Sequence, residues 1–403
     1  MCSADEADDR ERYNEISIFE CSNPNDTTLV NPKLRKSDPY KCIKKYRRSA
    51  AGGGVEGYNS DNSSYRRSFE DLDRTVNYLL GIIFSTQTTD EKSGFRASLL
   101  QTVLFIDDRI RAVQVDLTTL MGKGMDNFRS NISLIRKIQL KILRYHLLSQ
   151  HLLSNLSTKK YEWKFGQKAL TTAITSYFAT WDVQNENNSA QDHMDLDEVM
   201  CYSSLLHVAS IINSRETSIQ SYNCTVSKQK WCGLTCEDGH GMSAILSLYR
   251  KYGSFVKRGF VNNDSSIPLS SFPKYQWALR IAADVETGNY LSVIRLLKTE
   301  ASDENYFLNK QNKWKILARC CMAQAMPTLR IGLLRCYNKG FMKEEKVKDY
   351  DVSKICLRNF YIILTHMLNC LVLNIMLLHS LQIFVTYLIQ KLRLGFVKML
   401  DCL

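Results

Sequence analysis

An apolar stripe between residues 103 and 120 decides the fold class of this chain. Its side chains recur at alternating steps of three and four residues, at Val103, Ile106, Ile110, Val113, Leu117 and Leu120. Because an α-helix completes a turn in 3.6 residues, this spacing places all six side chains on one face. The stripe therefore predicts a long amphipathic helix that buries one side against neighbouring helices.

The same helical spacing continues through most of the chain. Further helices are predicted at about 68–83, 134–152, 167–178, 277–285, 290–298, 314–325 and 328–341. The last four form two antiparallel pairs, interrupted at Gly288 and at Pro327. Strand-like alternation is nearly absent, and the chain of 403 residues has only 6 prolines and 18 glycines. The predicted fold class is all-α, with helix pairs stacked as in helical-repeat proteins.

Composition divides the chain into three regions. Residues 1–67 form a charged N-terminal segment, and order is expected to begin at Ser68, in a helical domain over 68–341. Residues 342–403 form a C-terminal region that is mostly apolar. Inside the helical domain, polar stretches at 182–197 and 213–241 are expected to be solvated insertions.

The C-terminal region contains an uncharged stretch from Asn359 to Gln390. It exceeds the length of about twenty residues that spans a bilayer. Polar side chains interrupt it, however, at His366, Asn369 and Asn374 among others, and such groups are costly in lipid. A divergent or buried helical end is therefore favoured over a membrane span.

Basic residues outnumber acidic ones by 53 to 41, a net charge of +12. A surplus of this size favours a polyanionic partner, either nucleic acid or an anionic membrane surface. The run over 41–48 interleaves cations with an aromatic ring, which suits phosphate contact with base stacking. A solvated segment or an import signal remains the alternative. The candidate nucleic-acid contacts are Lys41, Lys44, Lys45, Tyr46, Arg47 and Arg48, with Lys137, Lys141 and Arg144 as a second patch.

The predicted stripe helix also carries a set of charges. Asp107 and Asp108 are spaced to pair with Arg111 along the helix surface. Arg109 and Asp116 flank the apolar stripe, close to where a packed neighbour would lie. We expect Asp108, Arg109, Arg111 and Asp116 to be a structural motif that holds this helix against the next, with direct ligand binding as the alternative.

Motifs for catalysis and for metal binding are weak in this sequence. There is no Ser nucleophile elbow, no phosphate-binding loop, no dinucleotide fingerprint and no metalloprotease motif. Cys224, Cys232, Cys236 and His240 resemble a zinc set, but they lack the usual short Cys-x-x-Cys spacing. The thirteen cysteines follow no secretory leader and are expected to be reduced. We therefore expect no catalytic residues, no metal and no cofactor.

Several short motifs occur in a fixed order along the chain. They are Met1-Cys2-Ser3, Asp9 to Arg12, Phe19-Glu20, Ile43 to Gly52, Leu72 to Leu79, Phe105 to Ala112, Arg144 to Leu147 and Gly288-Asn-Tyr290. Each is loose alone, but the ordered set resembles the SAC/GANP family, helical scaffolds of messenger-RNA export at the nuclear pore. The resemblance covers roughly residues 1–350.

The resemblance implies a helical-repeat scaffold of PCI type that normally ends in a winged helix, which here would be divergent or incomplete. The implied partners are a PCI-domain protein, a small acidic DSS-type protein and nuclear pore components, with RNA bound as part of the complex. We therefore expect a non-enzymatic nuclear scaffold that couples transcription to mRNA export. The alternatives are a relative at the centrosome and spindle, in the cytoplasm, or a direct, sequence-independent RNA-binding module.

Overall fold

The structure is a computed structural model, and it describes most of the chain up to residue 333. The described residues are 2, 4–22, 28, 31–46, 67–85, 98–122, 125–154, 163–182, 189–220, 245–251, 271–298 and 313–333. Four sequence predictions lie outside these residues. They concern Arg47 and Arg48, the zinc-like set Cys224 to His240, the uncharged stretch 359–390 and the winged-helix region 342–403.

The described residues are mostly helical, as the sequence predicts. The α-helices are α1 (Ala4–Arg12), α3 (Phe69–Ser85), α4 (Leu99–Met121), α5 (Met125–Ser130), α6 (Ile132–Leu152), α7 (Trp163–Asp182), α8 (Ala190–Gln220), α10 (Pro273–Glu286), α11 (Tyr290–Lys298) and α13 (Lys313–Met322). Short 3-10 helices lie at η1 (Ile18–Glu20), η2 (Pro32–Leu34) and η6 (Ala323–Ala325). Where the structure describes the chain, β-pairing is limited to one isolated bridge between Cys21 and Ser37. The all-α prediction is confirmed.

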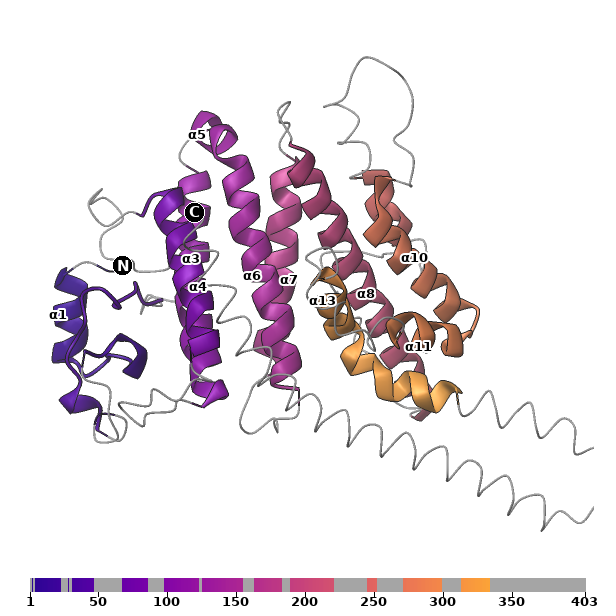
Figure 1. The fold of residues 1–403 in the computed structure, drawn as a ribbon, viewed down its shortest axis with the longest axis horizontal. Helices are drawn as coiled ribbons and strands as arrows, with labels where there is room; N and C mark the ends of the chain where they lie inside the picture. Colours follow the sequence, from indigo (N-terminus) through magenta and orange to yellow (C-terminus); the bar gives the residue numbers. More distant parts are fainter. Residues whose placement is uncertain are drawn as a thin grey trace, which may run out of the picture. The chain divides into compact units, whose positions relative to one another are not determined.

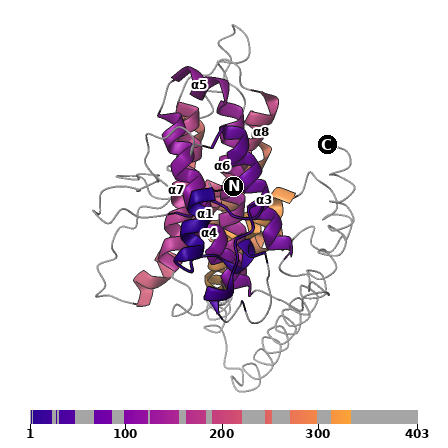
Figure 2. The ribbon, with the colours of Figure 1, turned by 90° about the vertical axis from the view of Figure 1, so that its left-hand side faces the viewer.

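Most helices pack against helices that are near them in the chain, as in a helical repeat (Figure 1). Helix α3 contacts α4 and α6, α6 contacts α7, and α8 contacts α10. Helix α13 returns to contact both α6 and α8. Figure 2 shows α1 at the N-terminal side of this stack, in front of α3 and α4. One hydrophobic core runs through the stack from α3 to α13.

The apolar stripe occupies the centre of α4. Ile106, Ile110 and Val113 are fully buried there, whereas Leu120, in the last turn, is only half-buried. The helix begins at a capping box in which the Ser98 side chain accepts from the N–H of Gln101. Between α10 and α11 the backbone at Gly288 has φ +73°, which glycine adopts without strain. Local sequence thus sets both where helices form and where they stop.

Two expectations about order are wrong. Residues before Ser68 were expected to form a charged segment without a fold, but α1, η1, η2 and the Cys21–Ser37 bridge lie within it. The stretch 182–197 was expected to be a solvated insertion, but residues 190–197 form the first turns of α8. The prediction assumed that these acidic side chains are solvated. In the structure Asp192 and Asp197 are buried and hydrogen-bonded. Helix α8 also extends through the first residues of the predicted insertion 213–241, to Gln220.

No helix in the described ranges is both long enough and apolar enough to span a membrane.

A charge placed in the stripe should unfold this domain. Ile110 has no exposed surface, so Ile110→Asp buries a carboxylate without a partner and should lower the free energy of unfolding by about 4 kcal/mol or more. Leu104→Asp is the matched control, because Leu104 lies on the same helix and is 51% exposed. Urea unfolding followed by circular dichroism measures both variants. Equal stability of the two would contradict the burial of the stripe.

Candidate functional site

Glu20 lies fully buried where the N-terminal segment meets α4. Its carboxylate accepts two hydrogen bonds from Arg109, at 3.1 Å from Nε to Oε1 and 2.7 Å from Nη2 to Oε2. Arg10 of α1 forms an ion pair with the same carboxylate, and the Ile43 backbone N–H donates to Oε1 at 2.9 Å. Arg10 has no exposed surface and Arg109 is 3% exposed. This Glu20 cluster (Arg10, Glu20, Arg109) joins α1 and η1 to α4, which lies 89 residues further along the chain at Arg109.

Burial and pairing act in opposite directions on these charges. Burial alone would raise the pKa of Glu20, because a carboxylate is poorly solvated inside a protein. Pairing with Arg109 and Arg10 outweighs burial and holds the pKa of Glu20 below its ordinary value. Burial likewise opposes the charge on Arg10, yet Glu20 raises the net pKa of Arg10. Pairing therefore favours the charged forms of Glu20 and Arg10, and Asp108 supplies a second carboxylate to Arg109.

The basic segment, residues 41–48, is described as far as Tyr46 and is held on both sides. Arg10 Nη1 donates to the Ile43 carbonyl at 3.0 Å, and the Lys45 N–H donates to Glu6 Oε1 at 2.9 Å. On the α4 side, Lys44 Nζ lies 2.8 Å from Asp116 Oδ1. The other oxygen of Asp116 accepts from Arg67 Nε at 2.8 Å. The start of the basic segment is thus clamped between α1 and α4.

The side chains of Lys41 and Lys45 form ion pairs nearer the surface. Lys41 Nζ lies 3.1 Å from Asp38, and Lys45 Nζ lies 3.1 Å from Glu15, both at half-exposed or exposed positions. Tyr46 is half-buried.

The second predicted basic patch does not form one free surface. Lys141 Nζ lies 2.6 Å from Asp73 Oδ1 and 2.7 Å from Asn77 Oδ1, so it ties α6 to α3. Arg144 binds Glu198 of α8 through two hydrogen bonds of 2.7 Å and 3.0 Å. Lys137 is exposed on α6, with no ion pair to any described residue. Two of the three cations therefore hold helices together.

Glu198 is the centre of a second buried charge cluster, on α8. Besides Arg144, its carboxylate accepts from Tyr202 at 2.9 Å and lies 3.3 Å from Lys274 Nζ of α10. Burial opposes its charge, but Arg144 and Lys274 keep the pKa of Glu198 below its ordinary value. The adjacent Asp197 accepts from the N–H groups of Lys274 and Tyr275 and so caps the start of α10. Burial raises the pKa of Asp197 to about 6.

The charges on α4 have partners other than those expected from spacing along the helix. Asp107 accepts from the Tyr145 hydroxyl at 2.8 Å, and burial raises the pKa of Asp107 to about 6. Asp108 pairs with Arg109 rather than with Arg111. Arg111 lies over the ring of Phe165, 5.9 Å from its centroid. Glu20, Tyr145 and Phe165 come from outside α4, whereas the Asp108–Arg109 pair lies within it. Most of these charges therefore act between elements.

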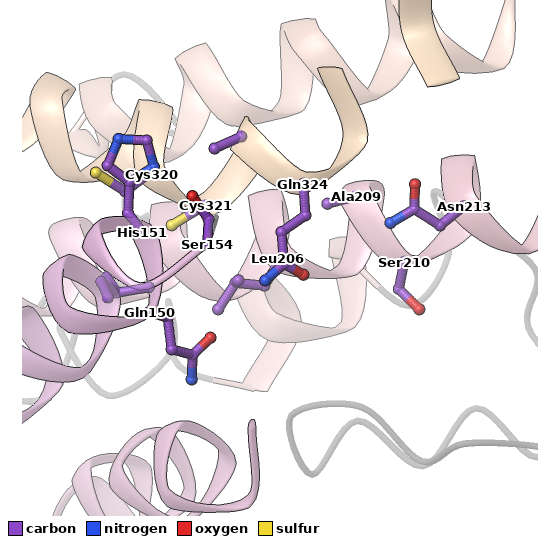
Figure 3. Close-up of a pocket in the computed structure, with 12 residues that line it drawn as sticks. Gln150, His151, Ser154, Leu206, Ala209, Ser210, Asn213, Cys320, Cys321 and Gln324 are labelled. Carbon is purple, nitrogen blue, oxygen red and sulfur yellow. The ribbon is translucent and has the colours of Figure 1, made fainter. Parts of the chain in front are cut away.

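A small pocket lies where α6, α8 and α13 meet (Figure 3). Its lining includes His151, Ser154, Asn213 and Cys320. Burial raises the pKa of the Cys320 thiol to about 12 and lowers the pKa of His151. The Cys320 thiol is therefore protonated at neutral pH and is not a thiolate nucleophile. Within the described ranges, no three side chains of His, Cys, Asp or Glu are grouped to hold a metal ion.

Sequence reasoning missed Arg10, Glu6, Asp197 and Glu198 as members of these clusters. Arg10 and Glu6 lay in a segment that was expected to lack a fold. Asp197 and Glu198 lay at or beside a stretch expected to be solvated, although Leu196, Val199 and Met200 repeat there at helical spacing. That spacing was the signal available in the sequence.

The buried carboxylate predicts a large effect of a small substitution. Glu20→Gln leaves two buried guanidinium groups without their shared counter-ion, so the free energy of unfolding should fall by about 3–5 kcal/mol. Glu15→Gln is the matched control, because the Glu15–Lys45 pair is partly exposed and should cost less than about 1 kcal/mol. Urea unfolding of the full chain measures both. Near-equal effects would mean that the Glu20 cluster does not hold the N-terminal segment.

Comparison with known proteins identifies the family. Neither a curated protein nor a solved structure matches the chain significantly. A model of the SAC3/GANP family matches residues 1–236, more than half of the chain. The match includes both partners of the Glu20–Arg109 contact and all of helices α1 to α8. The chain therefore belongs to the SAC3/GANP family.

Proposed function

We propose that this chain is a non-enzymatic scaffold of a nuclear complex that couples transcription to mRNA export at the nuclear pore. Membership of the SAC3/GANP family supports a role in mRNA export at the level of the family. The observation that carries the scaffold role is the Glu20 cluster, in which residues of three sequence motifs meet. These residues hold the motifs together inside one fold, which supports a structural rather than a catalytic role for them.

The partners we propose are a PCI-domain protein and a small acidic DSS-type protein, in the second transcription-and-export complex. The proposed partners also include nuclear pore components and RNA. The proposed location is the nucleus. A net charge of +12 supports an acidic protein or RNA as partner, because opposite charge speeds encounter and aids selection. Packing of helices in chain order supports extended surfaces for partners, as in other helical repeats.

Purification of the tagged full chain from cells tests the scaffold role. We expect a PCI-domain protein and a small acidic protein to co-purify in fixed ratio and to remain after ribonuclease treatment, identified by mass spectrometry. Recovery of centrosome and spindle proteins instead would support the alternative role in the cytoplasm. If ribonuclease treatment removes every co-purified protein, the chain is an RNA-binding module and not a scaffold.

Direct contact with RNA is the second part of the proposal. Lys44, Lys141 and Arg144 already neutralise carboxylates within the fold, so their release to phosphate would cost stability. Lys137 has no ion pair to a described residue, so its contact with phosphate avoids this cost. Arg47 and Arg48 lie outside the described residues. Tyr46 precedes Arg47 and supplies a ring for stacking on an unpaired base. The proposed contact is therefore sequence-independent and centred on these residues.

Salt dependence measures this contact. If about five cations meet phosphates of single-stranded RNA, log affinity should fall against log salt with a slope of about −3.5. Changing Arg47, Arg48 and Lys137 to Glu should weaken binding to all sequences alike and make the slope less steep by about 2. Lys168→Glu, at an exposed position of α7, is the matched control. An unchanged slope in the triple variant would remove these residues from the RNA contact. Localisation in cells is measured separately from binding in vitro. An import signal is the alternative role of the basic segment, and the triple variant would disable it too.

A further inference from the structure

Two cysteines that are forty residues apart in sequence lie next to each other beside the Glu20 cluster. The backbone N–H of Cys2 donates to the carbonyl of Cys42 at 2.9 Å. Cys2 also packs against the small apolar cluster that contains Cys42, Ala7 and Ile16. One backbone contact of this kind places two Cα atoms within the separation over which disulfides form, about 4–7 Å. Packing in one apolar cluster brings the two side chains together as well.

The surroundings of the two thiols differ in a way that matters for oxidation. Cys2 is half-buried and therefore reachable from solvent, whereas Cys42 is 1% exposed. The hydrogen bond from Cys42 lowers the pKa of Cys2, and the same contact together with burial raises the pKa of Cys42. Arg10 Nη1 lies 4.0 Å from Cys42 Sγ. Cys2 thus has the exposure and the lowered pKa expected of an attacking sulfur, and Cys42 lies beside it, where it can resolve it.

We propose that Cys2 and Cys42 are a redox pair that forms an intramolecular disulfide on exposure to a peroxide. The Cys2 thiolate attacks one oxygen of hydrogen peroxide, the O–O bond breaks, and Cys2 sulfenic acid and hydroxide form. The Cys42 sulfur then attacks the Cys2 sulfur and displaces hydroxide, while the Cys42 thiol proton ends on water. In sum, two thiols and one peroxide give one disulfide and two waters.

The disulfide would act on the same junction as the Glu20 cluster. It covalently links the residue before α1 to the basic segment, so α1 and that segment would stay joined even when the ion pairs open. Because a cross-link limits the unfolded chain, the oxidised protein should unfold at a higher temperature than the reduced protein, by several degrees. Oxidation would thereby fix the segment that carries Lys44 and Lys45.

Peptide mapping of the full chain tests the proposal without any substitution. The protein is treated with submillimolar hydrogen peroxide, blocked with N-ethylmaleimide, unfolded and digested with trypsin in the absence of reductant. Cleavage after Arg10, Lys41 and Lys44 releases Cys2 in peptide 1–10 and Cys42 in peptide 42–44. We expect these two peptides to be joined after peroxide and separate after reduction.

Two cysteine variants test whether Cys42 is the partner of Cys2. Cys42→Ala should leave Cys2 as a sulfenic acid, which dimedone captures, with no joined peptide. Cys21→Ala is the matched control, because Cys21 is also 1% exposed in the same segment but is not beside Cys2, and the joined peptide should persist. If Cys2 of the wild type stays fully blocked by N-ethylmaleimide after peroxide, or joins any cysteine other than Cys42 of its own chain, the proposal is wrong.

Discussion

The buried carboxylate of Glu20 sets a constraint that the N-terminal half of the molecule has to satisfy. An ionised group without water must be surrounded by opposite charge and hydrogen-bond donors, or it would be neutralised or would unfold its surroundings. Arg109 can meet it only if η1 lies on α4, and Arg10 can meet it only if α1 lies beside η1. The N–H of Ile43 completes the set and fixes where the basic segment runs. Together these contacts fix how α1, η1 and the basic segment lie against α4.

Periodicity made most of the helical domain predictable. The stripe on α4 defined its buried face, and the spacing around Leu134 and Leu170 gave α6 and α7 within a few residues. Predictions failed where composition competed with periodicity. The acidic start of α8 was assigned to solvent because Asp192 and Asp197 are charged, yet Ser133 and the start of α10 satisfy them inside the fold.

The buried charge clusters around Glu20 and Glu198 could not be predicted from the sequence, for a different reason. Arg109 and Glu20 are separated by 89 residues, and Lys44 and Asp116 by 72. Spacing rules relate residues within one helix, so they suggested Arg111 as the partner of Asp107 and Asp108. The tertiary fold supplied other partners. Five cations of the proposed RNA surface form ion pairs within the fold: Lys41, Lys44, Lys45, Lys141 and Arg144. A basic surplus read from composition therefore overstates the charge that is free for a partner.

Hydrogen exchange at the Ile43 amide tests most directly whether the Glu20 cluster holds the N-terminal segment on the helical stack. The Ile43 N–H is buried and its acceptor is the Glu20 carboxylate. In the full wild-type chain, its exchange should be as slow as that of amides in the middle of α4, because both would open only with the domain. Fast exchange at Ile43, typical of an exposed loop, while α4 stays protected would contradict the account.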